Sequence, residues 1–412
     1  MKQALKTLDN TNNTVQLHVV KGGSINWADR ISPVVKAVPP SGIRRFFDVA
    51  AEMKDVVSLG VGEPDFQTPL AVRQTCIDML QQGRTAYSSN QGMLELREEI
   101  ARVTKADYGV TYNPVSEVLV TVGVSEGMDL ALRAILAPGD HVLVPEPCYV
   151  SYNACVSFAG GVPIPVKTTI ETEFRLTVSQ LEAAMTPQTK VLLIGYPNNP
   201  TGAVMSREEL LEIAQFAHKH DLIVISDEIY AKLTYEGEHT CFSSLPDMRD
   251  RTILLNGFSK AYAMTGWRLG YAMANPEFIG AMNKIHQYTM LCAPVTAQAA
   301  ALTALREGEQ DVAMMVAEYN KRRQLMLAGF RSMGLNCFEP KGAFYIFPSV
   351  RELGFTSMEF AERLLMTEKV ALVPGGAFGE SGEGFVRCSY ASSIEKLTIA
   401  LERIGRFVQG LK

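Results

Sequence analysis

Short apolar runs alternate with longer amphipathic stretches along the middle of the chain, from about residue 73 to residue 295. Val, Ile and Leu dominate six of these runs and predict strands at 117–123, 141–147, 190–197, 222–230, 252–257 and 269–274. Intervening stretches such as 206–220 have the periodicity of an amphipathic helix. Because strands that are apolar throughout are typical of parallel sheets buried on both faces, the pattern predicts a large α/β domain with a mostly parallel sheet flanked by helices.

The pattern changes after about residue 296. A long amphipathic helix ending at Gly334 is followed by three strand-like segments (342–350, 370–375 and 384–390) and a final helical segment, 393–411. These elements predict a smaller α+β domain, and the stretch 56–66 could belong to either domain. We expect an N-terminal extension over 1–28, a small domain built from 29–72 and 296–412, and a large domain over 73–295.

Composition excludes several classes of protein. The net charge of −5 and the absence of a long basic run argue against nucleic-acid binding. No apolar run approaches the roughly 18 residues of a membrane helix, and residues 1–20 contain no signal-peptide core. The seven scattered cysteines form no C-x-x-C pair, which suits reduced thiols. We predict a soluble cytoplasmic protein without membrane or nucleic-acid partners.

Polar side chains follow the predicted strands, at the edge where an open α/β sheet binds its ligands. Taken in chain order they are Gly123-Val124-Ser125, then Tyr149, then Asn198, Asn199, Thr201 and Gly202, then Asp227, Glu228 and Tyr230, then Ser259 and Lys260, with Arg268 just before the sixth strand. Taken singly, each has an ordinary explanation: a helix cap, a turn or a surface charge.

Taken together, these residues supply the groups that pyridoxal phosphate (PLP) needs. A lysine amine can form an imine with the aldehyde, and a carboxylate can keep the ring nitrogen protonated. An aromatic side chain can stack on the ring. Backbone amides at a helix start, hydroxyl groups and a guanidinium can bind the phosphate. This combination of groups therefore predicts a PLP site that includes Lys260.

Five segments extend this interpretation into a family resemblance: "VGEPDF" (61–66), "YPNNPTG" (196–202), "SDEIY" (226–230), "NGFSKAYAMTGWRLGYA" (256–272) and "FVRCSYA" (385–391). Together they closely resemble class I aminotransferases of the PLP-dependent fold type I, and most of all the aspartate and aromatic aminotransferase group. The matching motifs run in the family's order from about residue 30 to the C-terminus.

The resemblance implies a role for each cofactor-binding residue. Lys260 would be the Schiff-base lysine and the base that moves the substrate proton, and Asp227 would pair with the pyridinium nitrogen. Asn199 and Tyr230 would hydrogen-bond the ring oxygen, and Tyr149 would stack on the ring. The phosphate would be held by Gly123, Val124, Ser125, Ser259 and Arg268.

The resemblance also implies how the substrate binds and how subunits combine. Arg387 would clamp the substrate α-carboxylate with two parallel hydrogen bonds, beside the Gly62 amide and Asn199. Tyr87, in "TAYSSNQG", would reach the phosphate of the neighbouring subunit, so a homodimer is implied. Glu126 brings negative charge near the phosphate, and we expect its side chain to point away.

Other residues carry weaker signals. The pair His218 and His220 lacks a spaced carboxylate or cysteine partner, so we expect no metal site. Cys148 and the methionines at 314 and 315 are interpreted as packing residues. The amino-acid donor stays open among aspartate, aromatic residues, alanine and methionine, because specificity in the family depends on a few pocket residues and on the segment near 39–47.

The function predicted from the sequence is a PLP-dependent aminotransferase that passes an amino group from an L-amino acid to a 2-oxo acid, with 2-oxoglutarate the expected acceptor. The order of events would be ping-pong, through the Lys260 Schiff base. One alternative is a carbon–sulfur β-lyase of the same fold, which would share Lys260, Asp227 and Arg387. The other is a non-catalytic regulator with an aminotransferase-like domain.

Overall fold

A computed structural model of the chain describes residues 26–40 and 53–411. The chain divides into two compact units, Met1–Pro39 and Pro40–Lys412. The first contains a short 3-10 helix, η1 (Trp27–Arg30), and helix α1 (Pro33–Ala37). Most of the predicted N-terminal extension, and residues 41–47 of the segment expected to influence specificity, lie outside the described residues.

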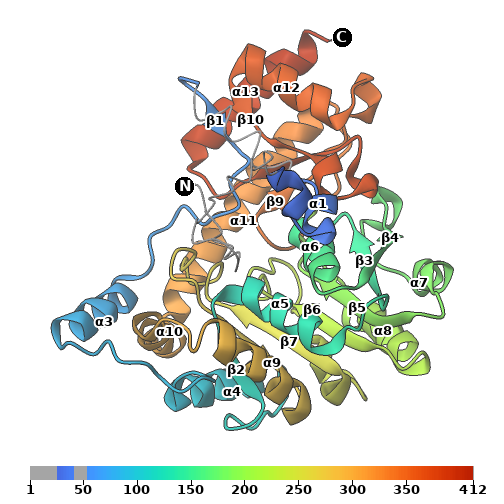
Figure 1. Cartoon of the computed structure of the whole chain (residues 1–412). Helices are drawn as coiled ribbons and strands as arrows, with labels where there is room; N and C mark the ends of the chain where they lie inside the picture. The colour runs from blue at the N-terminus through green and yellow to red at the C-terminus, as the bar shows by residue number, and fades with distance from the viewer. Residues whose placement is uncertain (1–25, 41–52, 412) are drawn as a thin grey trace, which may run out of the picture. The chain divides into compact units, whose positions relative to one another are not determined.

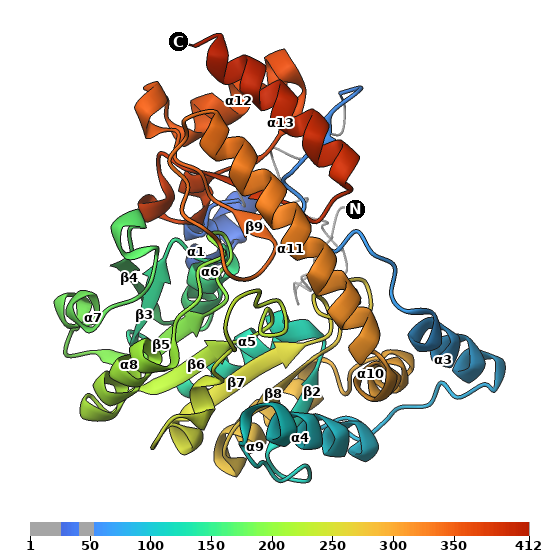
Figure 2. The same ribbon diagram turned by 180° about the vertical axis from the view of Figure 1, so that it is seen from behind.

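A seven-stranded sheet forms the centre of the second unit, with the strand order β2-β8-β7-β6-β5-β3-β4 (Figures 1 and 2). All of its pairings are parallel except those that β8 makes with β2 and β7. The strands are β2 (Val118–Thr121), β3 (His141–Glu146), β4 (Val162–Lys167), β5 (Thr189–Gly195), β6 (Ile223–Asp227), β7 (Thr252–Gly257) and β8 (Gly270–Met273). The predicted fold class and six predicted strands are confirmed.

Strand β4 was missed by the sequence pattern, because "VPIPVK" contains two prolines. Proline cannot donate a ladder hydrogen bond, and its presence argues against a central strand. The structure places β4 at the edge of the sheet, paired only with β3. An edge strand tolerates both Pro163 and Pro165, so the two prolines are compatible with β4 at the edge of the sheet.

The antiparallel direction of β8 explains how Arg268 joins the other polar residues. The carboxyl ends of β2, β3, β5, β6 and β7 meet at one edge of the sheet, and the amino end of β8 lies at the same edge because β8 runs the other way. Gly257, at the end of β7, pairs with Gly270, at the start of β8. Lys260 and Arg268 lie in the connection between β7 and β8, which leaves and re-enters the sheet at neighbouring points.

Glycine at position 270 lets a helix start directly on the sheet. A Cβ atom there would lie 2.6 Å from the backbone nitrogen of Val124 and 2.7 Å from the carbonyl carbon of Gly123. Both atoms belong to the first turn of helix α5 (Gly123–Ile135). The close approach brings the amino end of α5 to the edge of the sheet where Lys260 and Arg268 also lie.

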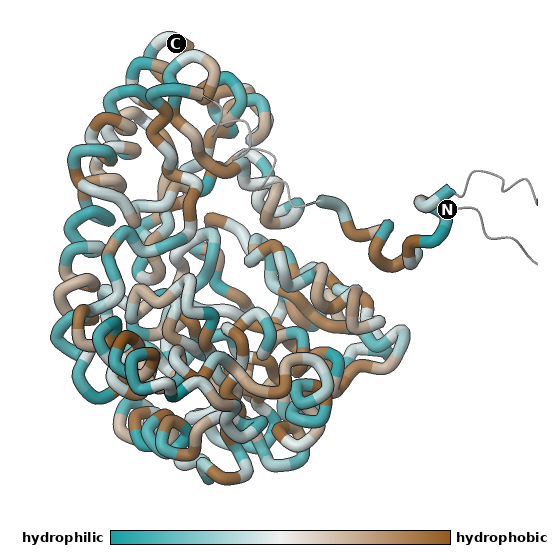
Figure 3. The backbone as a smooth tube through the Cα atoms, turned by 60° about the vertical axis from the view of Figure 1, so that its left-hand side comes forward, coloured by the Kyte–Doolittle hydropathy of each residue, from teal (hydrophilic) through white to brown (hydrophobic). Residues whose placement is uncertain are grey.

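Helices cover both faces of the sheet (Figures 1 and 2). On one face, α5, α6 (Ser151–Phe158) and α9 (Pro276–Thr289) pack on apolar strand residues such as Val144, Leu193 and Ile225. On the other face lie α4 (Leu94–Tyr108), α7 (Val178–Ala184), α8 (Arg207–Lys219) and α10 (Val295–Glu307). Hydrophobic and hydrophilic residues alternate along the surface helices (Figure 3), as expected for elements with one buried face.

The C-terminal part carries two small sheets. Strand β1 (Val57–Ser58) pairs with β10 (Val370–Ala371), which shows that the stretch starting at residue 56 joins the C-terminal strands. Strands β11 (Val373–Pro374), β12 (Val386–Ser389) and β9 (Tyr345–Ile346) form the other sheet. The helices are α11 (Glu309–Ser332), α12 (Ser357–Glu368) and α13 (Ile394–Gln409), while α3 (Leu70–Gln81) precedes α4. The predicted boundaries between a large and a small domain remain a prediction.

Candidate active site

A cavity of about 870 Å³ lies at the edge of the sheet where the polar residues meet. Its lining includes most of the residues predicted from the sequence, namely Gly62, Val124, Ser125, Tyr149, Asn199, Asp227, Tyr230, Ser259, Lys260, Arg268 and Arg387. They come from segments that are separated by up to about three hundred residues in the chain but share one edge of the fold. The cavity therefore brings the predicted cofactor and substrate residues together.

Lys260 points its amine into this cavity from the segment that follows β7. The amine donates a hydrogen bond of 2.7 Å to the carbonyl oxygen of Gly62 and lies 5.9 Å from the ring centre of Tyr230. Burial lowers the pKa of Lys260 to about 8. A lysine with this pKa is partly neutral near neutral pH, so it can react as a nucleophile.

Asp227 is held at the end of β6 by two donors. The hydroxyl of Tyr152 donates to Oδ2 at 2.8 Å, and the backbone N–H of Ile229 donates to Oδ1 at 3.2 Å. Burial raises the pKa of Asp227 to about 6 even though both hydrogen bonds favour the carboxylate. A cationic group in the cavity beside this carboxylate would keep it ionised, which is the requirement for pairing with a protonated ring nitrogen.

The amino end of helix α5 opens toward the cavity with Val124 and Ser125 in its first turn. Arg268 lies next to it: a Cβ atom added to Gly123 would be 2.7 Å from the Arg268 Nη2. Backbone N–H groups at a helix start, together with a guanidinium, form an anion site. Gly123 also has φ of +77°, a conformation that favours glycine.

Glu126 is turned away from this anion site, as expected. Its carboxylate accepts a hydrogen bond from the backbone N–H of Val122 and lies 2.7 Å from the Nδ1 atom of the buried His286. It does not form part of the cavity lining. The carboxylate of Glu126 therefore contacts the backbone of Val122 and His286 and does not enter the cavity, where an anion could bind.

Arg387 is a buried cation with 3% of its surface exposed. Nη1 donates to Asn199 Oδ1 at 2.9 Å, Nη2 donates to the Gly60 carbonyl at 2.6 Å, and the guanidinium lies 4.5 Å from the Tyr345 ring centre. Among the described residues, its Nε finds no hydrogen-bond partner, and the partners of its other two nitrogens are an amide and a backbone carbonyl, not carboxylates. A buried guanidinium without a counter-ion is costly unless a ligand supplies the anion.

Two tyrosines form a hydrogen-bonded pair across the cavity. The hydroxyl groups of Tyr230 and Tyr345 are 2.8 Å apart, and both side chains are buried. Tyr345 also limits what can stand at position 62, because a Cβ on Gly62 would lie 2.6 Å from the Tyr345 hydroxyl. The Gly62 position thus combines close packing on Tyr345 with the hydrogen bond to Lys260.

The sequence analysis missed Tyr152, Tyr345 and Glu63 as part of this cavity. Tyr152 lies in the first turn of α6, three residues after Tyr149, and the two rings meet edge to face with centres 5.8 Å apart. No helix was predicted from the sequence at this point, so nothing linked Tyr152 to Tyr149. Nothing in the motif "GAFYIF" marks Tyr345, because a buried tyrosine in a strand is an ordinary core residue.

Two of the residues given a role by the family resemblance lie outside the lining, as do Asn198, Thr201, Gly202 and Glu228 from the strand ends. Gly123 acts through its contact with Arg268, whereas Tyr87 is 80% exposed. His220 pairs with Glu182 on the surface, and Cys148 is buried in the core. Within residues 26–40 and 53–411, no group of three or more His, Cys, Asp or Glu side chains could hold a metal ion, and no helix is long and apolar enough to cross a membrane.

Comparison with known proteins decides the family. Residues 54–404 match the family described as aminotransferase class I and II. The chain is a member of this family. The aminotransferase is 47% identical to an aspartate aminotransferase of Pyrococcus abyssi over 91% of this chain and 97% of the relative. It is 43% identical to aromatic-amino-acid aminotransferase 2 of Thermococcus litoralis, over 93% and 99% of the two chains.

Solved structures agree with the assignment of fold type I. An aromatic aminotransferase from Pyrococcus horikoshii superposes with a TM-score of 0.86 at 44% identity, over 89% of this aminotransferase and 99% of that chain. An aspartate aminotransferase from Thermus thermophilus with maleate superposes with a TM-score of 0.87 at 40% identity, over 91% of this aminotransferase and 99% of that chain. Both the predicted family and the predicted enzyme class are confirmed by these matches.

The raised pKa of Asp227 predicts how stability depends on pH when no cofactor is present. The folded protein binds the Asp227 proton more tightly than the unfolded chain does, so this group's contribution falls as pH rises from about 4 to about 6. We expect Asp227→Asn to raise the free energy of unfolding of the cofactor-free protein by about 1–3 kcal/mol above pH 6, with no gain below about pH 4. Urea unfolding at a series of pH values measures this difference.

The exposed Asp250 offers a matched control, since its side chain is 81% exposed. Asp250→Asn should change the free energy of unfolding by less than about 0.5 kcal/mol at every pH. A loss of stability in Asp227→Asn above pH 6 would contradict the electrostatic description of this carboxyl group.

Proposed function

We propose that this aminotransferase binds PLP in the cavity and moves the amino group of an L-amino acid to a 2-oxo acid in two stages, with 2-oxoglutarate as the expected acceptor. The observation that carries the proposal is the convergence of three charged groups without ion-pair partners among the described residues: the amine of Lys260, the carboxylate of Asp227 and the guanidinium of Arg387. Each group matches a different part of a PLP–amino acid pair.

The residues present fit PLP as a ligand. The helix start at Val124 and Ser125, with Ser259 and Arg268 beside it, suits a phosphate. Tyr149 provides an aromatic face, while Asp227 suits a protonated ring nitrogen. Asn199 and Tyr230 provide an amide and a phenol for the ring oxygen. A cavity of about 870 Å³ is large enough for a cofactor and a small substrate.

When bound, PLP supplies an aldehyde that can join Lys260 covalently and a ring that accepts electrons from the substrate Cα. The amine of Lys260, once released, is the group placed to take and return the Cα proton, and its pKa of about 8 suits both directions. Asp227 keeps negative charge in a buried position, where its attraction for a ring proton is strong. Tyr152 fixes the direction of this carboxylate.

Arg387 is proposed to bind the substrate α-carboxylate. Its planar guanidinium can donate two parallel hydrogen bonds to a carboxylate, which orients the Cα substituents. The amide of Asn199 and the carbonyl of Gly60 already hold the guanidinium in place. Binding of a carboxylate would also satisfy the charge of Arg387, so part of the substrate affinity comes from a group that is unpaired in the free enzyme.

The amino-acid donor is open. Lys260, Arg268 and Arg387 are the cations among the described residues that line the cavity, and all have a proposed role. Any recognition of a second substrate carboxylate would therefore need a group from elsewhere, such as residues 41–47 or a partner subunit. Aspartate, aromatic amino acids, alanine and methionine remain the donors to compare, with 2-oxoglutarate as acceptor.

We also propose a homodimer with shared active sites in the cytoplasm. Tyr87 is 80% exposed and Tyr288 is 84% exposed, while Leu70 and Leu80 are also largely exposed. These exposed apolar side chains are available to pack against a second copy of the chain. All seven cysteines are free, which agrees with a reducing compartment.

Lys260→Ala should lose nearly all turnover, because the change removes both the covalent attachment and a proton carrier. Acid–base catalysis alone is worth about 10²–10⁴-fold in rate. Amino-group transfer is measured at saturating donor and acceptor. Lys232→Ala is the control, since Lys232 pairs with Asp107 and does not line the cavity. Near-normal rates for Lys260→Ala would overturn the proposed mechanism.

Arg387→Lys should raise KM for amino-acid donors by about 10- to 100-fold, since Lys cannot donate two parallel hydrogen bonds. Steady-state kinetics with a fixed acceptor measure this effect. Arg323→Lys provides the control: Arg323 is equally buried but pairs with Glu236 and lies outside the cavity. An unchanged KM in Arg387→Lys would mean that another group binds the carboxylate.

A further inference from the structure

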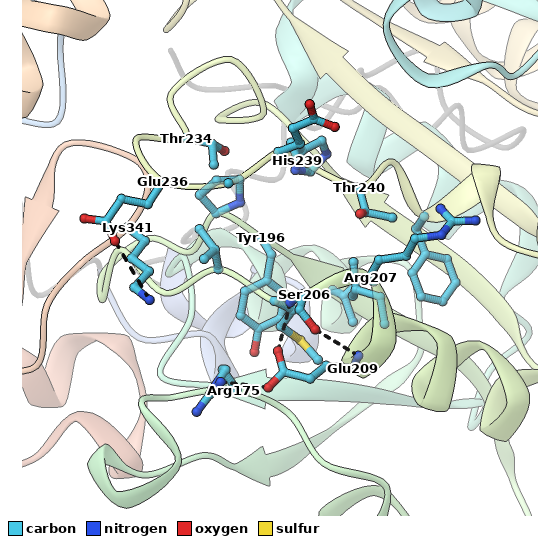
Figure 4. Close-up of a pocket in the computed structure, with 18 of the residues that line it drawn as sticks. Arg175, Tyr196, Ser206, Arg207, Glu209, Thr234, Glu236, His239, Thr240 and Lys341 are labelled. Atoms are coloured by element: carbon cyan, nitrogen blue, oxygen red, sulfur yellow. Dashed lines mark hydrogen bonds and ion pairs between the residues drawn. The ribbon is translucent and has the colours of Figure 1, made fainter.

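A second cavity of about 410 Å³ lies on the other face of the sheet at the same strand ends (Figure 4). Side chains alternate between the faces of a strand. Ser226 and Glu228 therefore face this second cavity, whereas Asp227 between them faces the active-site cavity. The end of β6 is the partition between the two cavities.

Glu228 is a buried carboxylate with 1% of its surface exposed. Oε1 accepts hydrogen bonds of 2.9 Å from the Ser226 hydroxyl and from the backbone N–H of Phe242, and Oε2 lies 2.7 Å from His239 Nε2. The Glu228 carboxylate is therefore held between the end of β6, Phe242 and His239. The net charge of the pair is then decided by whether His239 carries a second proton.

His239 is the partly exposed member of this pair. It lines the second cavity, and its side chain retains 11% exposure. Figure 4 shows His239 and Thr240 across the cavity from Ser206 and Glu209. The ring of Tyr108, from helix α4, packs edge to face on the imidazole with centres 5.7 Å apart. The buried thiol of Cys241 and the phenols of Tyr108, Tyr112 and Tyr271 are further titratable groups near Glu228.

The charges that line the second cavity surround His239 from several elements. Its carboxylates are Glu173, Glu209, Glu236, Glu238 and Glu339. Its cations are Arg175, Arg207 and Lys341; Arg175 pairs with Glu209 at 2.8 Å and Lys341 lies 3.9 Å from Glu236. Most of these carboxylates are paired with cations: Glu173 and Glu209 with Arg175, and Glu236 and Glu339 with Arg323.

We propose that Glu228 and His239 form a charge-adjusting pair behind the active site, in which Glu228 strengthens the negative field of Asp227 toward the PLP ring and His239 cancels that effect when it is protonated. Both are positioning residues, since neither lines the active-site cavity. The proposal rests on the proposed function, because it concerns the affinity of Asp227 for a protonated ring nitrogen.

Electrostatics support a coupling between the two carboxylates. The negative charge of Glu228 contributes to the raised pKa of Asp227, after the larger effect of burial. The same charge would favour any cation held against Asp227, including a protonated ring. With His239 neutral, the pair carries one negative charge; with His239 protonated, it carries none. The affinity for PLP should follow this difference.

The test compares PLP dissociation constants of the cofactor-free enzyme and two variants at about pH 5.5 and about pH 8.5, on either side of the ordinary titration range of histidine. Glu228→Gln removes the charge, and we expect about tenfold weaker binding than wild type at the higher pH and equal binding at the lower pH. His239→Gln leaves Glu228 charged. We expect binding like wild type at the higher pH and about tenfold tighter binding at the lower pH.

A purely structural role predicts another pattern, in which both variants bind PLP more weakly at both pH values. That pattern, or a His239→Gln variant that equals wild type throughout, would overturn the proposal. Circular dichroism shows whether Glu228→Gln folds. If it does not fold, the PLP affinity of His239→Gln at the two pH values tests the proposal without it. His220→Gln, in the surface pair of His220 with Glu182 3.2 Å apart, is the matched control and should equal wild type at both pH values.

The outcome separates this proposal from the proposed function. Wild-type protein that binds no PLP at either pH would overturn the cofactor assignment itself. Wild-type protein that binds PLP, with variants that do not follow the pattern above, would overturn the pair and leave the cofactor assignment standing.

Discussion

The proposed active site depends on buried charges that form no ion pair within the described part of the chain. Arg387, Lys260 and Asp227 lie in one cavity, and none forms an ion pair with a described residue. Removing an ion from water costs several kcal/mol unless another charge compensates it. This cost is partly offset by the hydrogen bond that Tyr152 donates to Asp227 and by those that Asn199 and the Gly60 carbonyl accept from Arg387. PLP with an amino acid would supply opposite charges. Binding and catalysis then draw on the same unpaired groups.

The sheet makes this arrangement possible because it brings distant segments to one edge. Parallel strands deliver Tyr149, Asn199, Asp227 and Lys260 after their carboxyl ends, and the reversed strand β8 delivers Arg268 at its amino end. The two sides of this edge differ in character. One side holds the proposed cofactor site, and the other holds the Glu228–His239 pair, one residue from Asp227. The end of β6 therefore lies between the two cavities, and the charge of Glu228 on one side acts on Asp227 on the other.

Much of the fold and the site was predictable from the sequence, and the failures have physical causes. Apolar runs located six strands, and β4 was missed because its prolines are acceptable only at an edge, which is a property of the whole sheet. Motifs predicted that Lys260, Asp227 and Arg387 serve one site, and the three residues do line one cavity, while their roles stay a prediction. Tyr152 and Tyr345 were missed because a tyrosine in a helix or strand has many uses, and only tertiary contacts show that one binds Asp227 and the other lies over Arg387. The same limit hid the pairing of His239 with Glu228, which are eleven residues apart.

The central claim is that the cavity transfers an amino group and retains it between two half-reactions. The most direct measurement mixes PLP-loaded enzyme with an L-amino acid in the absence of any 2-oxo acid acceptor, and quantifies the products of a single turnover. The account predicts that each active site releases one molecule of the matching 2-oxo acid, keeps the amino group and then stops, with no ammonia formed. Continuous release of ammonia with pyruvate would contradict it and would indicate a lyase.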